Sequence, residues 1–173
     1  PCPPPAVAWA CANDPAAVGS VVITASELSC EYGGLLVRGA DGGPATRDFI
    51  DALERAISLT PPSGRGAFEE SDLVSPYLEA LLARVDRGAI SSARPRVVVD
   101  AMYGAASGHL ARLLTEAGCD VVEIHVEQRE DFGGIHPDPR DPWADACEQA
   151  VLAHGADMGR LLDGDGDRAA VVD

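Results

Sequence analysis

Three aspartates alternate with two glycines near the end of the sequence, at Asp163, Asp165 and Asp167, and Arg168 follows directly. Side chains two residues apart point to the same side of an extended backbone, and the glycines let the chain bend, so the three carboxylates can converge on one point. Three anions this close repel one another unless a cation lies among them, and Mg²⁺ prefers a compact shell of oxygen ligands. The spacing therefore predicts a metal site with Asp163, Asp165 and Asp167 as ligands.

The hexamer 163–168 could instead be a solvated turn, because Asp and Gly both tolerate unusual backbone angles. Apolar runs flank it at residues 161–162 and 169–172, which favours a loop held between two buried strands. A helix–loop–helix calcium site is not indicated, because the sixth position of that loop requires Gly and is here Arg168. We expect a metal loop at the end of a strand, with the solvated turn as the alternative.

The elements that must position this loop alternate along the second half of the chain. Buried strands are predicted at residues 96–101, 120–126 and 157–162. Between them, one helix is expected to be capped by Ser107 and to end at Gly118, and another to start at Asp141-Pro142 and to end at Gly155. This order predicts a parallel sheet with helical crossovers, and ligands of such sheets lie beyond the carboxyl ends of the strands.

The first half of the chain predicts smaller elements. Short strands are expected at residues 21–24 and 35–38, and residues 1–19 give no reliable periodicity. Thr46 is expected to cap a helix. That helix has an apolar stripe at helical spacing that we expect to be buried, formed by Phe49, Ile50, Leu53 and Ile57.

Prolines and glycines near residue 61 interrupt both kinds of periodic structure, and helical spacing resumes over residues 73–86. We therefore divide the chain into a first domain at 1–60, a linker at 61–72 and a second domain at 73–173. The predicted fold class is α/β, with mixed or mainly parallel sheets flanked by helices.

Composition limits the function further. The 173 residues are 46% hydrophobic and only 5% aromatic, which is enough for an aliphatic core, and the formal charge of −15 disfavours a nucleic-acid or anionic-membrane surface. Five scattered cysteines without a CxxC pair indicate free thiols rather than a zinc site or a disulfide framework. No run predicts a membrane span or a signal peptide, so we expect a cytoplasmic location. A start at Pro1 without Met suggests a processed or partial chain.

Two other features are assigned no role. The glycines within residues 104–108 do not match the GxGxxG pattern of dinucleotide-binding loops, so nucleotide binding is not favoured. His125, His136 and His154 have no evident partner, and we expect them to be surface or packing residues.

Four stretches occur in a fixed order along the chain: ITAS at 23–26, EYGG with GADGGPAT at 31–46, VDAMYGAASG with FGGIHPDP within 99–139, and DGDGDR at 163–168. In order and spacing they resemble the α-D-phosphohexomutase superfamily, which comprises the phosphoglucomutases and phosphomannomutases. The resemblance covers the end of that family's first domain and most of its second, and implies an incomplete phosphohexomutase-type α/β fold.

The resemblance also implies a chemistry. Ser26 would carry a phosphoryl group and exchange it with a hexose phosphate through a bisphosphorylated sugar, so that hexose 1-phosphate and 6-phosphate interconvert. Asp163, Asp165 and Asp167, together with a phosphate oxygen on Ser26, would hold Mg²⁺. Arg168 would place a fixed positive charge near the transferred group. The family role is that of an isomerase, an intramolecular phosphotransferase of carbohydrate metabolism.

Two departures from the family pattern concern the phosphate. Glu27-Leu28-Ser29 stands where the family reads His-Asn-Pro, and Leu36 stands where it usually has a lysine. The local charge is lower by about 2 units, which disfavours a bound dianion by an amount on the order of a few kcal/mol. The chain also lacks the family's third and fourth domains, so the remaining domains or a partner chain would be needed for turnover.

These departures leave three hypotheses. The first is a Mg²⁺-dependent phosphohexomutase, or a piece of one. The second is a catalytically impaired homologue that binds a metal or a partner without turnover. The third is an acidic α/β domain whose aspartates form a solvated turn.

Overall fold

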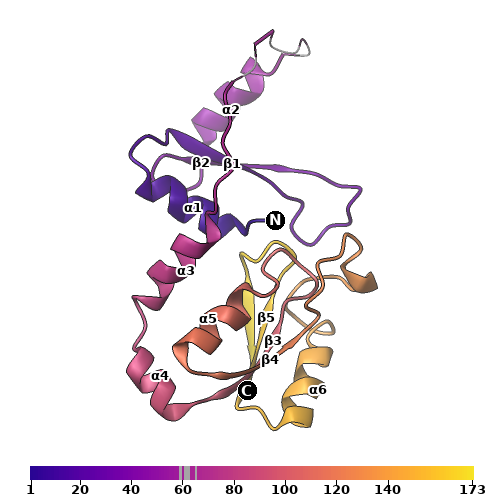
Figure 1. The fold of residues 1–173 in the computed structure, drawn as a ribbon. Helices are drawn as coiled ribbons and strands as arrows, with labels where there is room; N and C mark the ends of the chain where they lie inside the picture. The colour runs from indigo at the N-terminus through magenta and orange to yellow at the C-terminus, as the bar shows by residue number, and fades with distance from the viewer. Residues whose placement is uncertain (59, 61–62, 65) are drawn as a thin grey trace.

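The computed structural model describes residues 1–58, 60, 63–64 and 66–173. Two sheets with flanking helices make up this part of the chain (Figure 1). In chain order the elements are α1 (Pro4–Asn13), β1 (Gly19–Ile23), β2 (Leu35–Gly39), α2 (Arg47–Ala56), α3 (Val74–Leu82), α4 (Arg87–Ala93), β3 (Arg96–Asp100), α5 (His109–Ala117), β4 (Asp120–Ile124), a 3₁₀ turn (Phe132–Gly134), α6 (Asp145–His154), β5 (Met158–Leu162) and β6 (Ala169–Val172).

The larger sheet has the strand order β4-β3-β5-β6. Strand β3 runs parallel to β4 and β5, and β6 returns antiparallel to β5 after the aspartate loop. Residues 97–99 of β3 are buried on both faces, as expected for the central strand of a parallel sheet. Helix α6 packs on one face, where its Cys147 and Val151 join Val98 and Leu161 in the core. The predicted α/β class with a mainly parallel sheet is confirmed.

The smaller sheet is an antiparallel pair, with Gly19 of β1 opposite Gly39 of β2. Helix α1 packs on β1 and also contacts α3, where Trp9 meets Tyr77. Helix α1 was not predicted, because residues 1–19 showed no reliable periodicity. Its sequence, PPAVAWACAN, is apolar almost all round, so it lacks the one-sided stripe that identifies a surface helix. Pro4 is compatible with the start of a helix because the first N–H groups have no partner there in any case.

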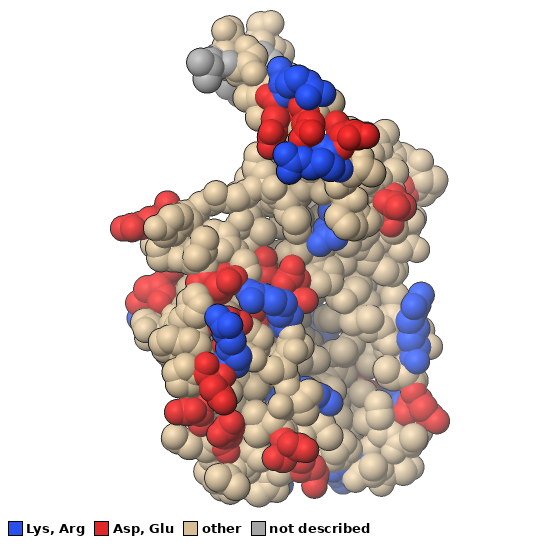
Figure 2. All heavy atoms as spheres, turned by 180° about the vertical axis from the view of Figure 1, so that it is seen from behind, with Lys and Arg blue, Asp and Glu red and all other residues tan. Residues whose placement is uncertain are grey.

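The expected burial of the apolar stripe on α2 is wrong. Phe49 is 54% exposed and Ile57 is 69% exposed, and α2 extends away from the rest of the molecule (Figure 1). The stripe forms an amphipathic pattern that stays largely exposed, and Phe49 borders an open hollow beside β1 and β2. The opposite face carries charges of both signs, visible at the top of Figure 2, including an Arg47–Asp51 ion pair. The predicted cap is confirmed, since the Phe49 N–H donates to Thr46 Oγ1 over 3.3 Å.

Three helix boundaries differ from the sequence-based expectations, and several strand ends differ by one or two residues. Ser107 does not cap α5: its hydroxyl donates to the Val126 carbonyl, and Gly108, at φ 76°, occupies the cap position. Helix α6 begins at Asp145, because residues 141–144 form turns. The helix expected over residues 73–86 ends at Leu82, and the separate helix α4 follows. The predicted helix ends at Gly118 and Gly155 are confirmed.

The division into 1–60, 61–72 and 73–173 stays a prediction, and residues 61, 62 and 65 of its linker lie outside the described residues. Within the described part of the chain, no helix is long and apolar enough to cross a membrane.

Candidate metal and phosphoryl-transfer site

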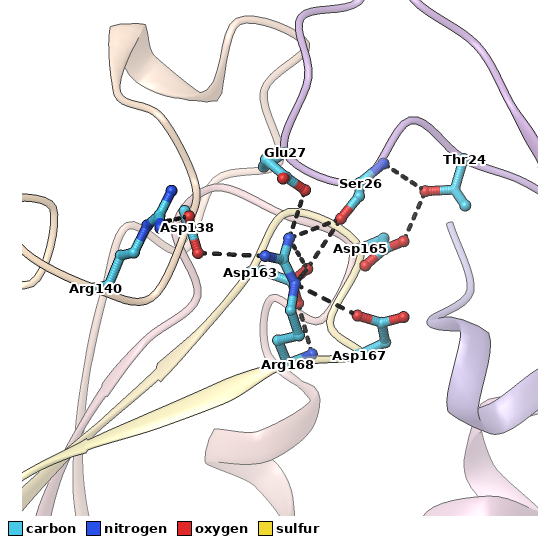
Figure 3. Close-up of polar contacts among 9 residues, drawn as sticks. All are labelled: Thr24, Ser26, Glu27, Asp138, Arg140, Asp163, Asp165, Asp167 and Arg168. Carbon is cyan, nitrogen blue, oxygen red and sulfur yellow. Dashed lines mark hydrogen bonds and ion pairs between the residues drawn. The ribbon is translucent and has the colours of Figure 1, made fainter.

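The aspartate loop connects β5 to β6 at the carboxyl end of β5, as predicted. The loop closes on itself, because the Asp163 N–H donates to the Arg168 carbonyl and the Gly166 N–H donates to the Asp163 carbonyl. Gly166 lies at φ 79°, a backbone conformation that favours glycine. Asp163, Asp165 and Asp167 each turn one carboxylate oxygen inward, and these oxygens all lie within 4.8 Å of one another (Figure 3).

The loop between β1 and β2 brings Ser26 to the same place. The Ser26 hydroxyl donates to Asp163 Oδ2 over 3.2 Å, across 137 residues of sequence. Ser26 lies at φ 53°, a left-handed conformation that is uncommon for a residue other than glycine. Such conformations persist where the surrounding structure holds them, and they occur often at functional sites. The two loops that the sequence singled out therefore meet.

Thr24 connects the serine loop to the aspartate loop. Its hydroxyl accepts from the Ser26 N–H over 2.9 Å and donates to Asp165 Oδ2 over 2.7 Å. One side chain thus fixes the backbone of the nucleophile candidate and the orientation of one carboxylate. Sequence reasoning assigned no role to Thr24, although it lies within the ITAS stretch.

Gly164 is the point at which the loops cross. Its carbonyl accepts from the Ala105 N–H, and its N–H donates to the Pro137 carbonyl. A Cβ at this position would lie 2.7 Å from the Ser26 carbonyl oxygen and 3.0 Å from the Phe132 ring. The close approach of Ser26 to the carboxylates therefore requires glycine at position 164.

Arg168 gathers the polar groups of the site around its guanidinium. Its Nε and Nη2 each lie 2.9 Å from Asp163 Oδ2, and its backbone N–H donates to Asp163 Oδ1. Nη2 also donates to Ser26 Oγ over 2.8 Å and pairs with Glu27 Oε2 at 2.5 Å. The guanidinium thus lies beside the Ser26 hydroxyl.

Glu27 therefore does not face the site as an unpaired anion. Its pKa is lowered by the neighbouring Ser26 hydroxyl, by a backbone N–H and by the charge of Arg168. The ionised carboxylate is matched by the guanidinium, which offsets part of the repulsion that the sequence led us to expect.

Asp138 is a further residue of the site to which sequence reasoning assigned no role. It lies in the FGGIHPDP stretch and is only 6% exposed. Its Oδ1 lies 3.3 Å from Arg168 Nη1, and its Oδ2 lies 2.5 Å from Arg140 Nε (Figure 3). The stretch itself was visible in the sequence, but the arginines that its carboxylate contacts could be known only from the folded chain.

Burial and neighbouring carboxylates raise the pKa values of Asp165 and Asp167. Burial, together with the charges of Asp163 and Asp167, raises the pKa of Asp165 to about 6, although the Thr24 hydrogen bond opposes this shift. Burial and the charge of Asp163 also raise the pKa of Asp167. Both shifts are expected where anions converge without full compensation.

The donor set fits a hard divalent cation. Asp165 Oδ1 is buried and has no hydrogen-bond partner among the described residues. A buried, ionised oxygen without a partner is costly, and coordination to a cation would supply the missing interaction. Carboxylate oxygens suit Mg²⁺ in particular.

Of the three histidines without an evident partner in the sequence, His125 has one in the structure. His125 Nδ1 lies 2.9 Å from Asp100 Oδ1, and its ring packs 4.6 Å from that of Tyr103. Asp100 is fully buried at the end of β3, so the pair joins the ends of β3 and β4. His136 packs against Trp143.

Comparisons with known proteins identify the family of both parts of the chain. The family model for phosphoglucomutase/phosphomannomutase α/β/α domain I matches residues 1–60, and that for α/β/α domain II matches residues 75–173. A protein from Thermus thermophilus that is described as a phosphomannomutase has a crystal structure that superimposes with a TM-score of 0.88, at 30% identity, over 99% of this chain and 40% of its own.

Curated relatives give the same result. A phosphoglucomutase/phosphomannomutase of Thermococcus kodakarensis is 36% identical over 99% of this chain, and a phosphoglucosamine mutase of Frankia casuarinae is 38% identical over 99%. In both cases the chain spans 38% of the relative's length. Because the domain II model alone matches more than half of the residues, this chain belongs to the phosphoglucomutase/phosphomannomutase family.

Proposed function

We propose that this chain contributes the phosphoserine and the metal site of a Mg²⁺-dependent phosphohexomutase, which interconverts hexose 1-phosphate and hexose 6-phosphate through a bisphosphorylated sugar. The observation that carries the proposal is the position of the Ser26 hydroxyl, in hydrogen-bond contact with both Asp163 and Arg168. Phosphoryl transfer depends mainly on positioning and charge stabilisation, and this arrangement provides both.

Each residue has a role in the proposal. Ser26 accepts and returns the phosphoryl group, and Thr24 holds its backbone in place. Asp163, Asp165 and Asp167 would hold Mg²⁺, which when bound supplies positive charge to the phosphoryl oxygens. Arg168 Nη2 already donates to the Ser26 oxygen and would donate to a phosphate attached there.

The substrate class and the remaining parts of the enzyme are also proposed. Relatives of the chain include phosphoglucomutase/phosphomannomutases and phosphoglucosamine mutases, which supports a hexose or aminohexose phosphate as substrate. Since the chain spans under two fifths of these relatives, further domains or a partner chain would complete the sugar site. The cytoplasmic location stays a prediction.

One observation favours the second candidate, a homologue that binds the cation without turnover. Glu27 Oε2 pairs with the same Arg168 nitrogen that contacts Ser26 Oγ. A dianionic phosphate on Ser26 would have to share or displace this carboxylate, since like charges at such distances repel strongly.

The test is a phosphorylation assay on the chain as it stands. The protein is incubated with Mg²⁺ and a hexose 1,6-bisphosphate, and its intact mass is measured. The proposal predicts a gain of one phosphate that is absent in Ser26→Ala and retained in Ser29→Ala, a matched serine of the same loop. If the wild-type chain gains no phosphate although Mg²⁺ raises its Tm, and Asp165→Ala abolishes that rise, the non-catalytic candidate is correct. Phosphate gain in Ser26→Ala would contradict the assigned nucleophile.

A further inference from the structure

The Arg168 guanidinium pairs with Glu27 through Nη2 and with Asp163 through Nε, and Asp163 is a group that the proposed cation also needs. Asp163 Oδ2 accepts from Nε of the guanidinium and lies 2.9 Å from Nη2, and Asp163 is also one of the three proposed metal ligands. A cation that draws on this carboxylate weakens its hydrogen bonds to the arginine, because the same lone pairs serve both. A second holding group, independent of the metal, would keep the guanidinium in place.

Asp138 has the properties of such a group. Its carboxylate is buried, lies 3.3 Å from Arg168 Nη1, and belongs neither to the aspartate loop nor to the serine loop. Its second oxygen pairs with Arg140, whose side chain is 73% exposed. A buried carboxylate is costly unless its charge is paired, and here two guanidinium groups pair with it.

The backbone around Asp138 is fixed to the same loop. The Gly164 N–H donates to the carbonyl of buried Pro137 over 3.1 Å, next to Asp138. The Asp138 N–H donates to the His136 backbone carbonyl, and the Asp138 carbonyl accepts from the Arg140 backbone N–H, so this segment forms a tight turn. The segment 136–140 therefore supports both the main chain of the aspartate loop and the arginine that ends it.

Because the guanidinium of Arg168 is planar, its contact with Asp138 helps to set the direction of the whole group. Fixing Nε and Nη1 of a rigid plane also fixes Nη2. In this structure Asp163 contacts Nε and Asp138 contacts Nη1, while Nη2 reaches Ser26 Oγ beside its pairs with Glu27 and Asp163. We propose that Asp138 is a positioning residue: it directs Arg168 Nη2 at the Ser26 oxygen and at a phosphate attached there, independently of the metal ligands. This inference rests on the function proposed above.

The kinetic test measures the rate at which a hexose 1,6-bisphosphate phosphorylates Ser26 with saturating Mg²⁺. In Asp138→Ala we expect the rate at saturating donor to fall by about 10- to 100-fold, since a displacement near 1 Å can have an effect of this size. The donor concentration at half-maximal rate and the Mg²⁺ affinity should change by less than about 3-fold, because the metal ligands remain. Asp138→Asn keeps an acceptor oxygen for Arg168 and should recover much of the rate.

The control is Arg140→Ala, which removes the other arginine on Asp138 but leaves the Arg168 contact. If Arg140→Ala and Asp138→Ala lower the rate and the Tm equally, Asp138 acts only on stability and the inference is overturned. A wild-type rate in Asp138→Ala also overturns it.

A second measurement does not depend on turnover. The side-chain N–H signals of Arg168, assigned by their loss in Arg168→Lys, should show hindered guanidinium rotation by NMR in the wild-type chain with Mg²⁺. Asp138→Ala should release this rotation, whereas Asp131→Asn, at an exposed aspartate paired with Arg129, should not. If no phosphate is transferred but the rotation is released, the proposed function fails and the positioning role stands. Unchanged rotation in Asp138→Ala rejects the positioning role.

Discussion

Replacing Gly164 by alanine tests whether the crossing of the two loops sets the position of Ser26. The added Cβ would lie 2.7 Å from the Ser26 carbonyl oxygen, which is about 0.7 Å short of ordinary van der Waals contact. The Phe132 ring, at 3.0 Å, restricts movement in another direction. A carbonyl cannot rotate away as a side chain can, so the serine loop itself must shift.

The expected effects are of two sizes. Overpacking of this kind costs roughly 1–3 kcal/mol of stability, and a kilocalorie corresponds to about 2–4 °C in Tm for a chain of this length. The phosphorylation rate should fall by about 10- to 100-fold, because the hydroxyl moves by a large part of an ångström relative to Arg168 and Asp163. Mg²⁺ affinity should change little, since the three carboxylates remain.

The assay measures the initial rate of Ser26 phosphorylation by intact mass, with a Mg²⁺ titration and a thermal unfolding curve for each variant. Gly33→Ala is the matched control, because a Cβ there meets no atom within 4 Å. A wild-type rate in Gly164→Ala would refute the idea that the crossing positions Ser26. A loss of Mg²⁺ binding as large as the loss of rate would show that the substitution disturbs the carboxylates instead.

Three further predictions follow from single side chains. Thr24→Val removes the donor to Asp165 and should lower the free energy of unfolding in urea by about 1–3 kcal/mol. The control Thr115→Val removes an exposed hydroxyl and should change this free energy by under about 0.5 kcal/mol. Equal losses in the two variants would contradict the prediction. Burial raises the pKa of Asp165 to about 6, so the metal-free folded chain binds this proton more tightly than the unfolded chain. The ionised carboxylate therefore destabilises the fold at pH 7.5, and this destabilisation decreases as the pH falls below about 6 toward the unfolded pKa of about 4. In EDTA, the stability of the wild type relative to Asp165→Asn should therefore rise when the pH is lowered from 7.5 to 5. The Mg²⁺ affinity of the wild type should fall over the same range. A stability difference that does not change with pH would contradict the raised pKa. Burial raises the pKa of Cys147 to about 12, so at pH 8 a disulfide reagent should label exposed Cys30 and spare Cys147 until the chain unfolds; labelling of both in the native chain would contradict the burial.

The parts of the fold that sequence predicted share a strong local signal. The run 96–101 is apolar enough to mark a central strand, and Gly118 ends its helix through a left-handed conformation that few other residues adopt. Asp163, Asp165 and Asp167 converge because their loop turns back on itself, and the glycines that permit this turn lie between them in the sequence. These features depend on residues that are close together in the sequence, so they could be predicted from the sequence alone.

The parts that sequence missed depend on what packs from elsewhere. The apolar stripe through Phe49 has a regular period, yet the period does not say whether an element covers it. Helix α1 has no polar side and therefore no period. Glu27 looked like an unpaired anion because its partner, Arg168, is 141 residues away. Thr24 and Asp138 were visible as residue types, but their contacts across the loops exist only in the folded chain.

The central claim is that a cation held by the aspartate loop lies beside the Ser26 hydroxyl. Crystals grown with Mn²⁺, which accepts the same oxygen ligands as Mg²⁺ and scatters anomalously, test it directly. We predict one strong anomalous peak among Asp163, Asp165 and Asp167, within a phosphate's reach of Ser26 Oγ. A peak elsewhere, or none at a Mn²⁺ concentration that raises the Tm, would contradict it.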